Sequence, residues 1–353
     1  MISVVNRRSI IAVPIRPALL LVVFVLALLS GCGAKSPTTE RLAGAIFGTS
    51  WSLTYLVPAE GIDGALVEKT LADKFALVNR SMSTYDPNSL ISRFNRMPAA
   101  EAVEVDPDFA YVLATALDIG RHTDGAYDVT VPPLLALWGF GPDGPSDIPS
   151  DADIATVRVF VGPQNLIWDA EFRLLAKRQQ DVELDFSSIA KGYAVDIGAD
   201  ALLDLGIENF MFEIGGEVRL HGNSPRGDDW RIAIERPDSS GRQAQAAIVG
   251  TGIAIATSGD YRNFFEQQGE RYSHLIDPRT GRPIKHELVS VTVIDPSTTI
   301  ADAWATALIV LGVEQGMAIA QSRGLAAYFI RREGDLLSIA MTEAFKPYLS
   351  SQE

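Results

Sequence analysis

Hydrophobic positions along the chain follow two different periods, and the elements that they predict fall into separate blocks. Residues 66–82 and 107–123 carry apolar side chains at the three- and four-residue spacing of a helix. Short apolar or alternating runs, typical of strands, gather in the second half. Blocks of this kind favour an α+β fold with mostly antiparallel sheets and flanking helices over a doubly wound sheet. We expect strands at residues 51–57, 230–235, 245–249, 253–257 and 288–294.

Three further segments are rich in Gly, Pro or Ser and interrupt these runs. Residues 141–153 predict an exposed loop. Residues 182–206 predict a strand, a tight Ser-Ser turn with Ser187 as a helix N-cap, and an amphipathic helix. Gly215 and Gly216 lie inside a β-like run, which indicates a bulge or a close approach of the backbone to a ligand.

The N-terminus has the pattern of an export signal. Three arginines precede an apolar run over residues 18–30, which is short for a bilayer span of about 20 residues. The run ends in Leu-Ser-Gly-Cys, a sequence that resembles a bacterial lipobox with Cys32 as the lipidated residue. We therefore expect a signal peptide over residues 1–31 and a lipidated tether over residues 32–44. The alternative is an uncleaved signal anchor in which Cys32 occurs by chance.

Charge changes the picture of possible partners. The formal charge is −14, and removing Arg7, Arg8 and Arg16 with no acidic residue makes it −17 for residues 32–353. Nucleic-acid binding requires a basic face, so it is not expected. An anionic ligand would need a local device such as a metal ion, a lysine or backbone amides.

The apolar segment at residues 301–311 carries a carboxylate and a hydroxyl four positions apart, Asp302 and Thr306. On a helix the two side chains share a face and offer hard oxygen ligands that suit Mg²⁺. Two simpler interpretations stay open. Asp302 could belong to a capping box begun at Thr299, and Thr306 could bond back to the preceding turn.

Two other places carry candidate chemistry. Asp185 and Lys191 bracket the predicted Ser-Ser turn, where a helix N-terminus and a lysine could hold a phosphate. They could equally form a surface ion pair. His274, one of four histidines, precedes a turn signature that would hold it at the end of a strand. It is a candidate general base or a structural histidine.

Six segments taken together, in this order, resemble the motifs of the ApbE family of bacterial FAD:protein FMN transferases, which are often periplasmic lipoproteins. The resemblance extends from about residue 48 to about residue 324, so we expect one ApbE-like domain over residues 45–345. The segments are residues 82–95, 125–141, 184–196, 212–222, 274–284 and 302–312.

The resemblance implies an activity and a set of site residues. Such enzymes use Mg²⁺ to cleave FAD and attach FMN through a phosphoester to a Thr or Ser of a partner flavoprotein, releasing AMP. His274 would deprotonate the acceptor hydroxyl. The metal ligands would be Asp302, Thr306 and the backbone carbonyl of Ser188. The FAD contacts would be Phe47, Tyr85, Ala126, Tyr127, Asp128, Asp185, Lys191 and Ile276.

The resemblance also implies an acceptor protein and a cellular location. The acceptor would be a subunit of a membrane redox complex, and the enzyme would be anchored by lipid to a membrane and face the periplasm. Two other functions remain open: a Mg²⁺-dependent FAD pyrophosphatase that releases FMN and AMP, and a flavin-binding lipoprotein without catalysis. His274, Asp302 and Thr306 argue against the last, because binding alone requires no base.

Overall fold

The computed structural model describes residues 38–140, 148–237, 243–259, 264–267, 270–334 and 336–350. The predicted signal peptide and Cys32 lie outside these residues, so they stay predictions. Strand β1 (Thr39–Ile46) begins within residues 32–44, which were expected to form the tether. The expected exposed loop at residues 141–153 is wrong at its end, where helix α6 (Asp151–Arg158) starts behind a capping box on Ser150. Residues 141–147 are outside the described part.

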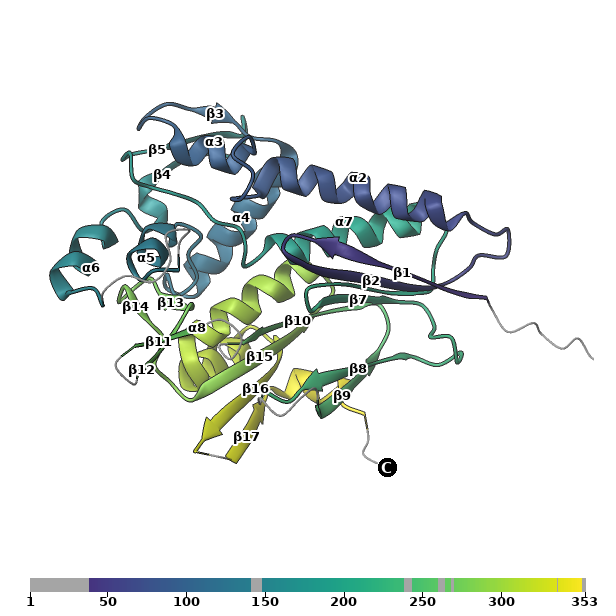
Figure 1. The fold of residues 1–353 in the computed structure, drawn as a ribbon. Coiled ribbons are helices and arrows are strands. Elements are labelled where there is room, and N and C mark those ends of the chain that lie inside the picture. The colour runs from purple at the N-terminus through teal and green to yellow at the C-terminus, as the bar shows by residue number, and fades with distance from the viewer. Residues whose placement is uncertain are drawn as a thin grey trace, which may run out of the picture. The chain divides into compact units, whose positions relative to one another are not determined.

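An eight-stranded antiparallel sheet forms the centre of the fold (Figure 1). Its order is β1-β2-β6-β7-β10-β15-β16-β17, and every neighbouring pair is antiparallel. The predicted α+β class is confirmed. Besides β1, its strands are β2 (Thr49–Leu56), β6 (Phe210–Ile214), β7 (Glu217–His221), β10 (Ile253–Gly259), β15 (Leu288–Asp295), β16 (Ala326–Glu333) and β17 (Leu336–Met341).

Alternating side chains give the sheet two separate cores. In β16, Ala327 and Phe329 pack into the larger cluster, whereas Tyr328 and Ile330 pack into a second one. The period of two in a strand requires this alternation, and burial on both faces explains why the strand reads as continuously apolar. Both faces of the sheet are therefore covered.

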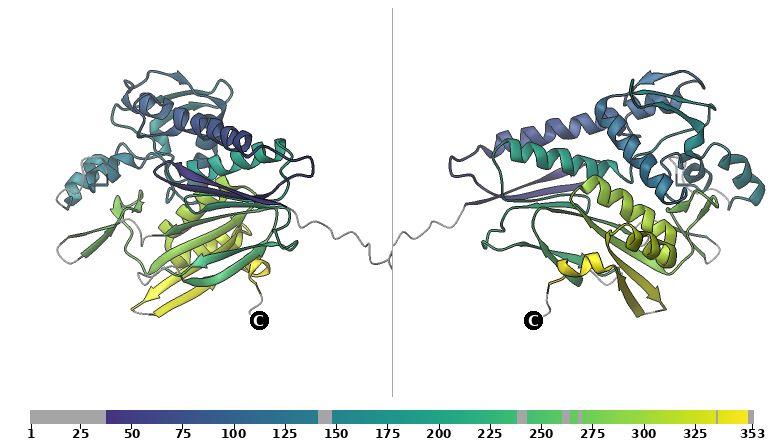
Figure 2. Two further views of the ribbon diagram at one scale, coloured as in Figure 1. Left: turned by 45° about the vertical axis from the view of Figure 1, so that its right-hand side comes forward. Right: turned by 180° about the vertical axis from the view of Figure 1, so that it is seen from behind.

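Helices cover the face with the larger core (Figure 2). Helix α8 (Thr298–Ser322) packs on β10 and β15, and it also contacts α7 (Ala190–Asp204). Its length and composition would suit a membrane span, but 61% of its apolar window is buried, as in a core helix. Its dihedrals break at Gly312, where φ is 75°. The other helices of this block are α2 (Gly64–Met82) and α4 (Pro107–His122).

The opposite face carries a separate hairpin and the C-terminal turn. Strands β8 (Trp230–Glu235) and β9 (Ala244–Gly250) pair with each other, and η2 (Glu343–Tyr348) packs beside them with Phe345 fully buried. This turn extends past the predicted domain end at residue 345. The strands predicted at residues 230–235, 245–249, 253–257 and 288–294 are all confirmed, and that at 51–57 is confirmed to residue 56.

The remaining elements are short and surround the region where the predicted site residues lie. A small apolar cluster joins α5, α6 and the β13–β14 hairpin through side chains such as Leu134, Trp138 and Ile276. The elements are α3 (Leu90–Arg96), β3 (Val103–Glu104), α5 (Pro132–Leu137), η1 (Pro163–Asn165), β4 (Leu166–Asp169), β5 (Leu174–Lys177), β11 (Phe264–Gln267), β12 (Glu270–Ser273), β13 (Ile276–Asp277) and β14 (Arg282–Pro283).

One local prediction is wrong and a second is wrong in one of its two alternatives. Residues 182–186 belong to no sheet, and the N-cap of α7 is Ile189 instead of Ser187, with no side-chain cap. Gly215 and Gly216 form the two-residue turn of the β6–β7 hairpin rather than a bulge, whereas the close approach of this backbone to a ligand stays a prediction. Both have positive φ, 64° and 108°, a conformation that glycine adopts without steric cost and that tight hairpin turns require.

Candidate active site

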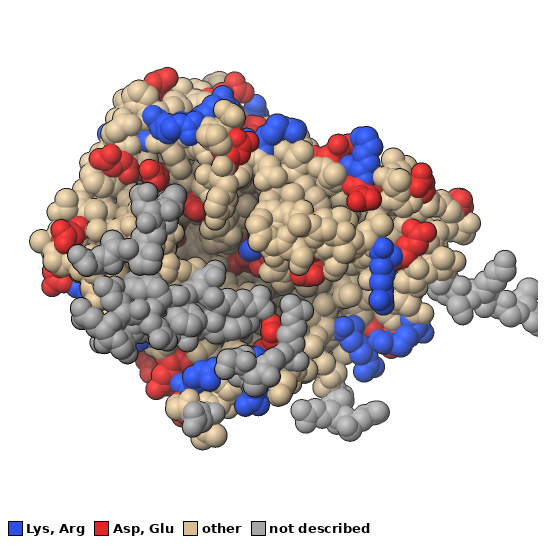
Figure 3. Space-filling model, in the orientation of Figure 1, with Lys and Arg blue, Asp and Glu red and all other residues tan. Residues whose placement is uncertain are grey.

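A cavity of about 810 Å³ collects nearly all the predicted site residues. Figure 3 shows the hollowed surface near the centre of one face of the molecule. Of the twelve predicted binding, metal and catalytic residues, eleven line this cavity. They are Tyr85, Ala126, Tyr127, Asp128, Asp185, Ser188, Lys191, His274, Ile276, Asp302 and Thr306.

Phe47 is the exception. The structure does not bring it to the cavity; its ring packs edge-on against Phe75, with ring centroids 5.9 Å apart. Its φ of 52° fits its position in the tight turn between β1 and β2. The predicted flavin contact of Phe47 therefore has no support in the geometry of the described residues.

Buried polar side chains fix the extended segment that carries Asp185 and Ser188. The Asn95 side chain accepts a hydrogen bond from the Leu184 N–H and donates one to the Leu184 carbonyl, as a neighbouring strand would. The Lys177 ammonium donates to three backbone carbonyls, including that of Val182. Burial lowers the pKa of Lys177. The Asp185 N–H donates to the Val129 carbonyl at 2.9 Å. The segment thus holds its shape without belonging to a sheet, because these side chains and one backbone carbonyl satisfy its backbone.

Helices α7 and α8 cap each other. The N–H of Gly192, in the first turn of α7, donates to Asp302 Oδ2 of α8 at 3.0 Å. In return, Asp196 of α7 accepts bonds from the N–H groups of Thr298 and Thr299 at 2.8 and 2.9 Å, at the start of α8. First-turn N–H groups have no partner within their own helix, so a carboxylate there is favourable. The reciprocal caps fix Asp302 relative to α7.

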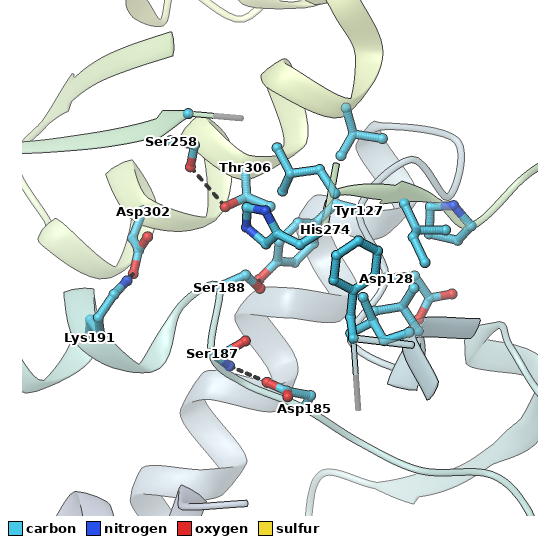
Figure 4. A pocket seen from close by; sticks show the side chains of 18 of the residues that line it. Tyr127, Asp128, Asp185, Ser187, Ser188, Lys191, Ser258, His274, Asp302 and Thr306 are labelled. Atoms are coloured by element: carbon cyan, nitrogen blue, oxygen red, sulfur yellow. Dashed lines mark hydrogen bonds and ion pairs between the residues drawn. The ribbon is translucent and has the colours of Figure 1, made fainter. Parts of the chain in front are cut away.

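Three charged groups meet at this junction, and Figure 4 labels two of them, Lys191 and Asp302. Lys191 Nζ lies 3.2 Å from Glu217 Oε1 and 3.7 Å from Asp302 Oδ2. Both carboxylates are buried, whereas the Lys191 side chain is partly exposed. Burial alone would lower the pKa of Lys191, but the Asp302 and Glu217 charges together raise it. Burial raises the pKa of Asp302 and of Glu217, and the Lys191 charge opposes both increases. The alternative of a surface ion pair between Asp185 and Lys191 is therefore wrong, because Lys191 forms a charged triad with Glu217 and Asp302.

The capping interpretation of Asp302 is also wrong in its detail. The N-cap of α8 is Ser297, whose Oγ accepts from the Ile300 N–H at 3.4 Å, and no capping box starts at Thr299. Asp302 is only 3% exposed and serves α7 instead of its own helix. Thr306 Oγ1 lies 3.0 Å from Ser258 Oγ at the end of β10, so its hydroxyl faces the cavity wall.

The donors at this place fit a small hard cation. Both contacts of the Asp302 carboxylate involve Oδ2, which leaves Oδ1 as a donor. Thr306 lies one helical turn further on. The Ser188 hydroxyl is engaged with the Tyr127 hydroxyl at 2.9 Å, and its carbonyl is the predicted ligand. No cluster of three His, Cys, Asp or Glu side chains occurs among the described residues. One carboxylate, a hydroxyl and a carbonyl suit Mg²⁺, which keeps several waters, better than zinc.

Tyr127 and Asp128 form the opposite wall. Burial raises the pKa of Tyr127, so its phenol stays protonated and can act as a hydrogen-bond donor. Asp128 Oδ1 accepts from the N–H and the hydroxyl of Thr130 at 2.8 and 2.6 Å. Burial nevertheless raises the Asp128 pKa. At the rim, Tyr85 is 95% exposed, which is unusual for a large aromatic ring and leaves its face open to a planar ligand.

His274 lines the cavity from the link between β12 and β13. Its ring lies 6.5 Å from the Phe140 ring, at an interplanar angle of 69°. In the turn that follows, the Asp277 side chain accepts from the backbone and guanidinium of Arg279, and Trp138 Nε1 donates to the Gly281 carbonyl at 2.8 Å. Figure 4 shows His274 among the side chains that line the cavity. The turn that the sequence predicted after His274 is therefore present.

Glu217 and Ser258 are among the polar residues of the cavity that sequence reasoning missed. Glu217 follows directly on the Gly215-Gly216 pair, which was itself a signal of a close approach. Ser258 had no signal, because a serine near the end of a strand is ordinary.

Known proteins resemble this chain over most of its length. The ApbE family model matches residues 47–329. The FAD:protein FMN transferase of Vibrio cholerae is 42% identical over 326 residues, covering 92% of this chain and 97% of that protein. The protein of the same name from Escherichia coli K12 is 39% identical over 328 residues, covering 91% and 92%.

Solved structures show the same fold. The flavin transferase ApbE of Vibrio cholerae superimposes with a TM-score of 0.81 at 41% identity, covering 88% of this chain and all of that one. The flavinyl transferase ApbE of Pseudomonas stutzeri gives 0.82 at 39% identity, covering 90% and 98%. The match over most of both chains leaves one conclusion: the chain belongs to the ApbE family.

Proposed function

We infer that this chain is an FAD:protein FMN transferase. The observation that carries this inference is the convergence of His274, the Asp302–Thr306 pair and Lys191 in one cavity of about 810 Å³. A pocket of that size suits a dinucleotide-sized ligand. The relatives of about 40% identity with this name span nearly the whole chain.

The residues divide the task of binding FAD. We assign the flavin ring to the exposed face of Tyr85 at the rim, and the pyrophosphate to the end of the cavity with Lys191 and the first turn of α7. A protonated lysine beside a helix N-terminus is a favourable environment for phosphate. Asp185, Asp128 and the backbone around Ala126 and Ile276 line the space between.

We propose that the resident metal is Mg²⁺, held by Asp302, Thr306 and the Ser188 carbonyl. When bound, Mg²⁺ supplies positive charge against the phosphoryl oxygens on which negative charge develops. Asp302 and Thr306 hold fixed positions because the reciprocal caps anchor α8 to α7 and Ser258 contacts Thr306.

His274 acts as the base. A Thr or Ser hydroxyl is a poor nucleophile at neutral pH, so a neighbouring group has to take its proton. The hydroxyl oxygen forms a bond to the phosphorus of the FMN half of FAD, and its proton passes to an imidazole nitrogen of His274. The bond from that phosphorus to the bridging oxygen breaks, and AMP leaves. A partner flavoprotein carrying that hydroxyl is therefore the second substrate.

The test is a transfer reaction with residues 33–353, FAD, Mg²⁺ and a candidate acceptor domain, followed by a denaturing gel. We expect a fluorescent acceptor band that EDTA removes and that the Asp302→Asn variant fails to produce. Free FMN and AMP without a labelled acceptor would indicate the pyrophosphatase, because water would then replace the hydroxyl. Bound, unaltered FAD would indicate a carrier.

We further propose that the chain is a lipoprotein that faces the periplasm, anchored to a membrane through Cys32. The support is the arginine-led apolar run over residues 18–30 and the lipobox-like tetrapeptide that follows it. The acceptor would then be the periplasmic part of a subunit of a membrane redox complex.

A further inference from the structure

Glu217 lies in the cavity wall at a position where burial of its carboxylate lowers the stability of the fold. It is the first residue of β7, only 3% exposed, and its Oε1 lies 3.2 Å from Lys191 Nζ. Its other carboxyl oxygen, Oε2, is buried and makes no hydrogen bond in the described part of the chain. An unpartnered buried carboxyl oxygen costs stability, which indicates a role beyond packing.

Lys191 lies between two carboxylates, and the β6–β7 turn passes close to its stem. A Cβ on Gly215 would lie 3.4 Å from Lys191 Cδ, so the turn borders the path of this side chain. The ammonium is 0.5 Å closer to Glu217 than to Asp302, from distances of 3.2 and 3.7 Å. A movement of the ammonium from Glu217 toward Asp302 would bring it into full contact with Asp302, the proposed metal ligand.

We propose that Glu217 is a positioning residue that sets the divalent-cation affinity of the site by binding the Lys191 ammonium. This inference rests on the cation site proposed at Asp302. An ammonium fully paired with Asp302 would neutralise the carboxylate and repel a cation, because unit charges a few ångströms apart interact strongly in a buried site. Glu217 draws the ammonium aside and leaves both charges useful: the carboxylate for the cation, the lysine for phosphate.

The experiment measures cation binding directly, without FAD or acceptor. Mn²⁺, a paramagnetic substitute for Mg²⁺, is titrated into residues 33–353 and free Mn²⁺ is followed by electron paramagnetic resonance. We expect Glu217→Ala to weaken Mn²⁺ binding about tenfold, in line with the loss of a group that orients a metal ligand. Glu217→Gln keeps an oxygen that can accept from Lys191, so its loss should be smaller.

Two variants serve as controls. Glu213→Gln changes a carboxylate of the neighbouring strand that bonds Ser52 and the Gly216 N–H and does not line the cavity, so its Mn²⁺ affinity should match wild type. Lys191→Gln removes the ammonium itself. In that background, Glu217→Ala should change the affinity much less, because its effect passes through Lys191.

The outcomes distinguish an error in the proposed cation site from an error in the role of Glu217. If Asp302→Asn binds Mn²⁺ as wild type does, the proposed cation site is wrong. If Asp302→Asn loses binding and both Glu217 variants keep it, only the role of Glu217 is wrong. Equal losses for Glu217→Ala with and without Lys191 would also overturn the inference, because a structural defect would act regardless of the lysine. Where Glu217→Ala fails to fold, Glu217→Gln decides by the same comparison.

Discussion

At the scale of single residues, the site depends on side chains whose ordinary chemistry is altered by burial. The carboxylates of Glu217 and Asp302 are buried, and the partly exposed Lys191 ammonium compensates both. Removing one member of such a set leaves a buried charge without its partner, which costs more than the contact was worth. Substitutions in the triad are therefore expected to affect folding as well as activity, whereas His274 offers a cleaner test.

Replacing His274 by alanine should separate chemistry from binding. The histidine is presented by the β12–β13 region and is not part of the charged triad, so FAD and Mg²⁺ should still bind. Loss of a general base typically lowers the rate by about 10²- to 10⁴-fold. Single-turnover transfer measured beside FAD binding by fluorescence quenching checks this. Transfer at the normal rate would show that another group takes the proton.

Asp295, which does not line the cavity, predicts how the stability of the fold depends on pH. Burial raises its pKa above 3.8, and its Oδ1 accepts from the Ser297 N–H at 2.9 Å. The folded chain therefore holds this proton more tightly than the unfolded chain, so stability is lost as pH rises from the ordinary pKa through the raised one. Asp295→Asn cannot ionise and keeps an acceptor for Ser297. Its free energy of unfolding, relative to wild type, should rise across that window.

Urea denaturation at several pH values between about 4 and 7 measures this difference, because the midpoint reports stability when the slope is unchanged. If Asp295→Asn instead loses stability relative to wild type as pH rises, the ionised carboxylate is favourable in the fold, and attraction to the nearby Arg219 outweighs the burial that we hold responsible.

At the scale of elements, the close contact between α7 and α8 determines where the proposed metal ligands lie. A Cβ on Gly192 would come within 2.4 Å of the Thr298 carbonyl and 2.8 Å of Asp302 Cβ. Glycine is therefore required by space alone, and its N–H is required by Asp302. The two helices approach closely enough for each to cap the other.

Gly192→Ala should push the two helices apart. We expect a loss of about 1–3 kcal/mol in the free energy of unfolding, typical of overpacking a core, and a higher Mg²⁺ requirement for transfer. Thermal unfolding and a Mg²⁺ titration of activity measure the two effects. Asp200→Ala, at an exposed position of the same helix, is the control and should leave the Mg²⁺ requirement unchanged. An unaltered Mg²⁺ requirement in Gly192→Ala would mean that the helix contact does not position Asp302.

The helices and strands also show how much of the fold could be predicted from the sequence. Helices α2 and α4 and strands β2, β8, β9, β10 and β15 followed from periodicity. Strand β16 was not predicted, and the edge strands β1 and β17 of the central sheet were missed because none of their residues is fully buried. The segment at residues 182–186 was wrongly predicted as a strand because its apolar and polar residues alternate. Its backbone groups bond to the side chains of Asn95 and Lys177 instead of to a neighbouring strand. The role of Asp302 in capping α7 was equally hidden, because the two helices are 110 residues apart at that bond.

At the scale of the whole molecule, the cavity gathers residues from Thr84 to Val310. Single-sequence spacing could rank Asp302, Thr306, Lys191 and His274 as candidates but could not bring them together. Their assignment to one site came from the resemblance to a family. Neither spacing nor the family resemblance identified Glu217 and Ser258. Each matters through a neighbour that only the fold brings close: Lys191 for Glu217 and Thr306 for Ser258.

The proposed attachment of the protein to a membrane is tested at Cys32. If the chain is a lipoprotein, full-length protein should partition into the membrane fraction of a bacterial cell, and Cys32→Ser should abolish lipid attachment without changing transfer by the isolated domain. Metabolic labelling with a fatty acid and fractionation measure this. Lipid-free Cys32 in a membrane-bound protein would instead indicate an uncleaved signal anchor.

The most direct test of the central claim is the stoichiometry of products. Intact-mass spectrometry of the acceptor, with AMP counted in the same reaction, follows both halves of FAD. We predict an acceptor heavier by one FMN less one water, one AMP for each modified acceptor, and no modification after its acceptor threonine or serine is replaced by alanine. AMP and free FMN in equal amounts, with the acceptor mass unchanged, would contradict the assignment and show that water is the true acceptor.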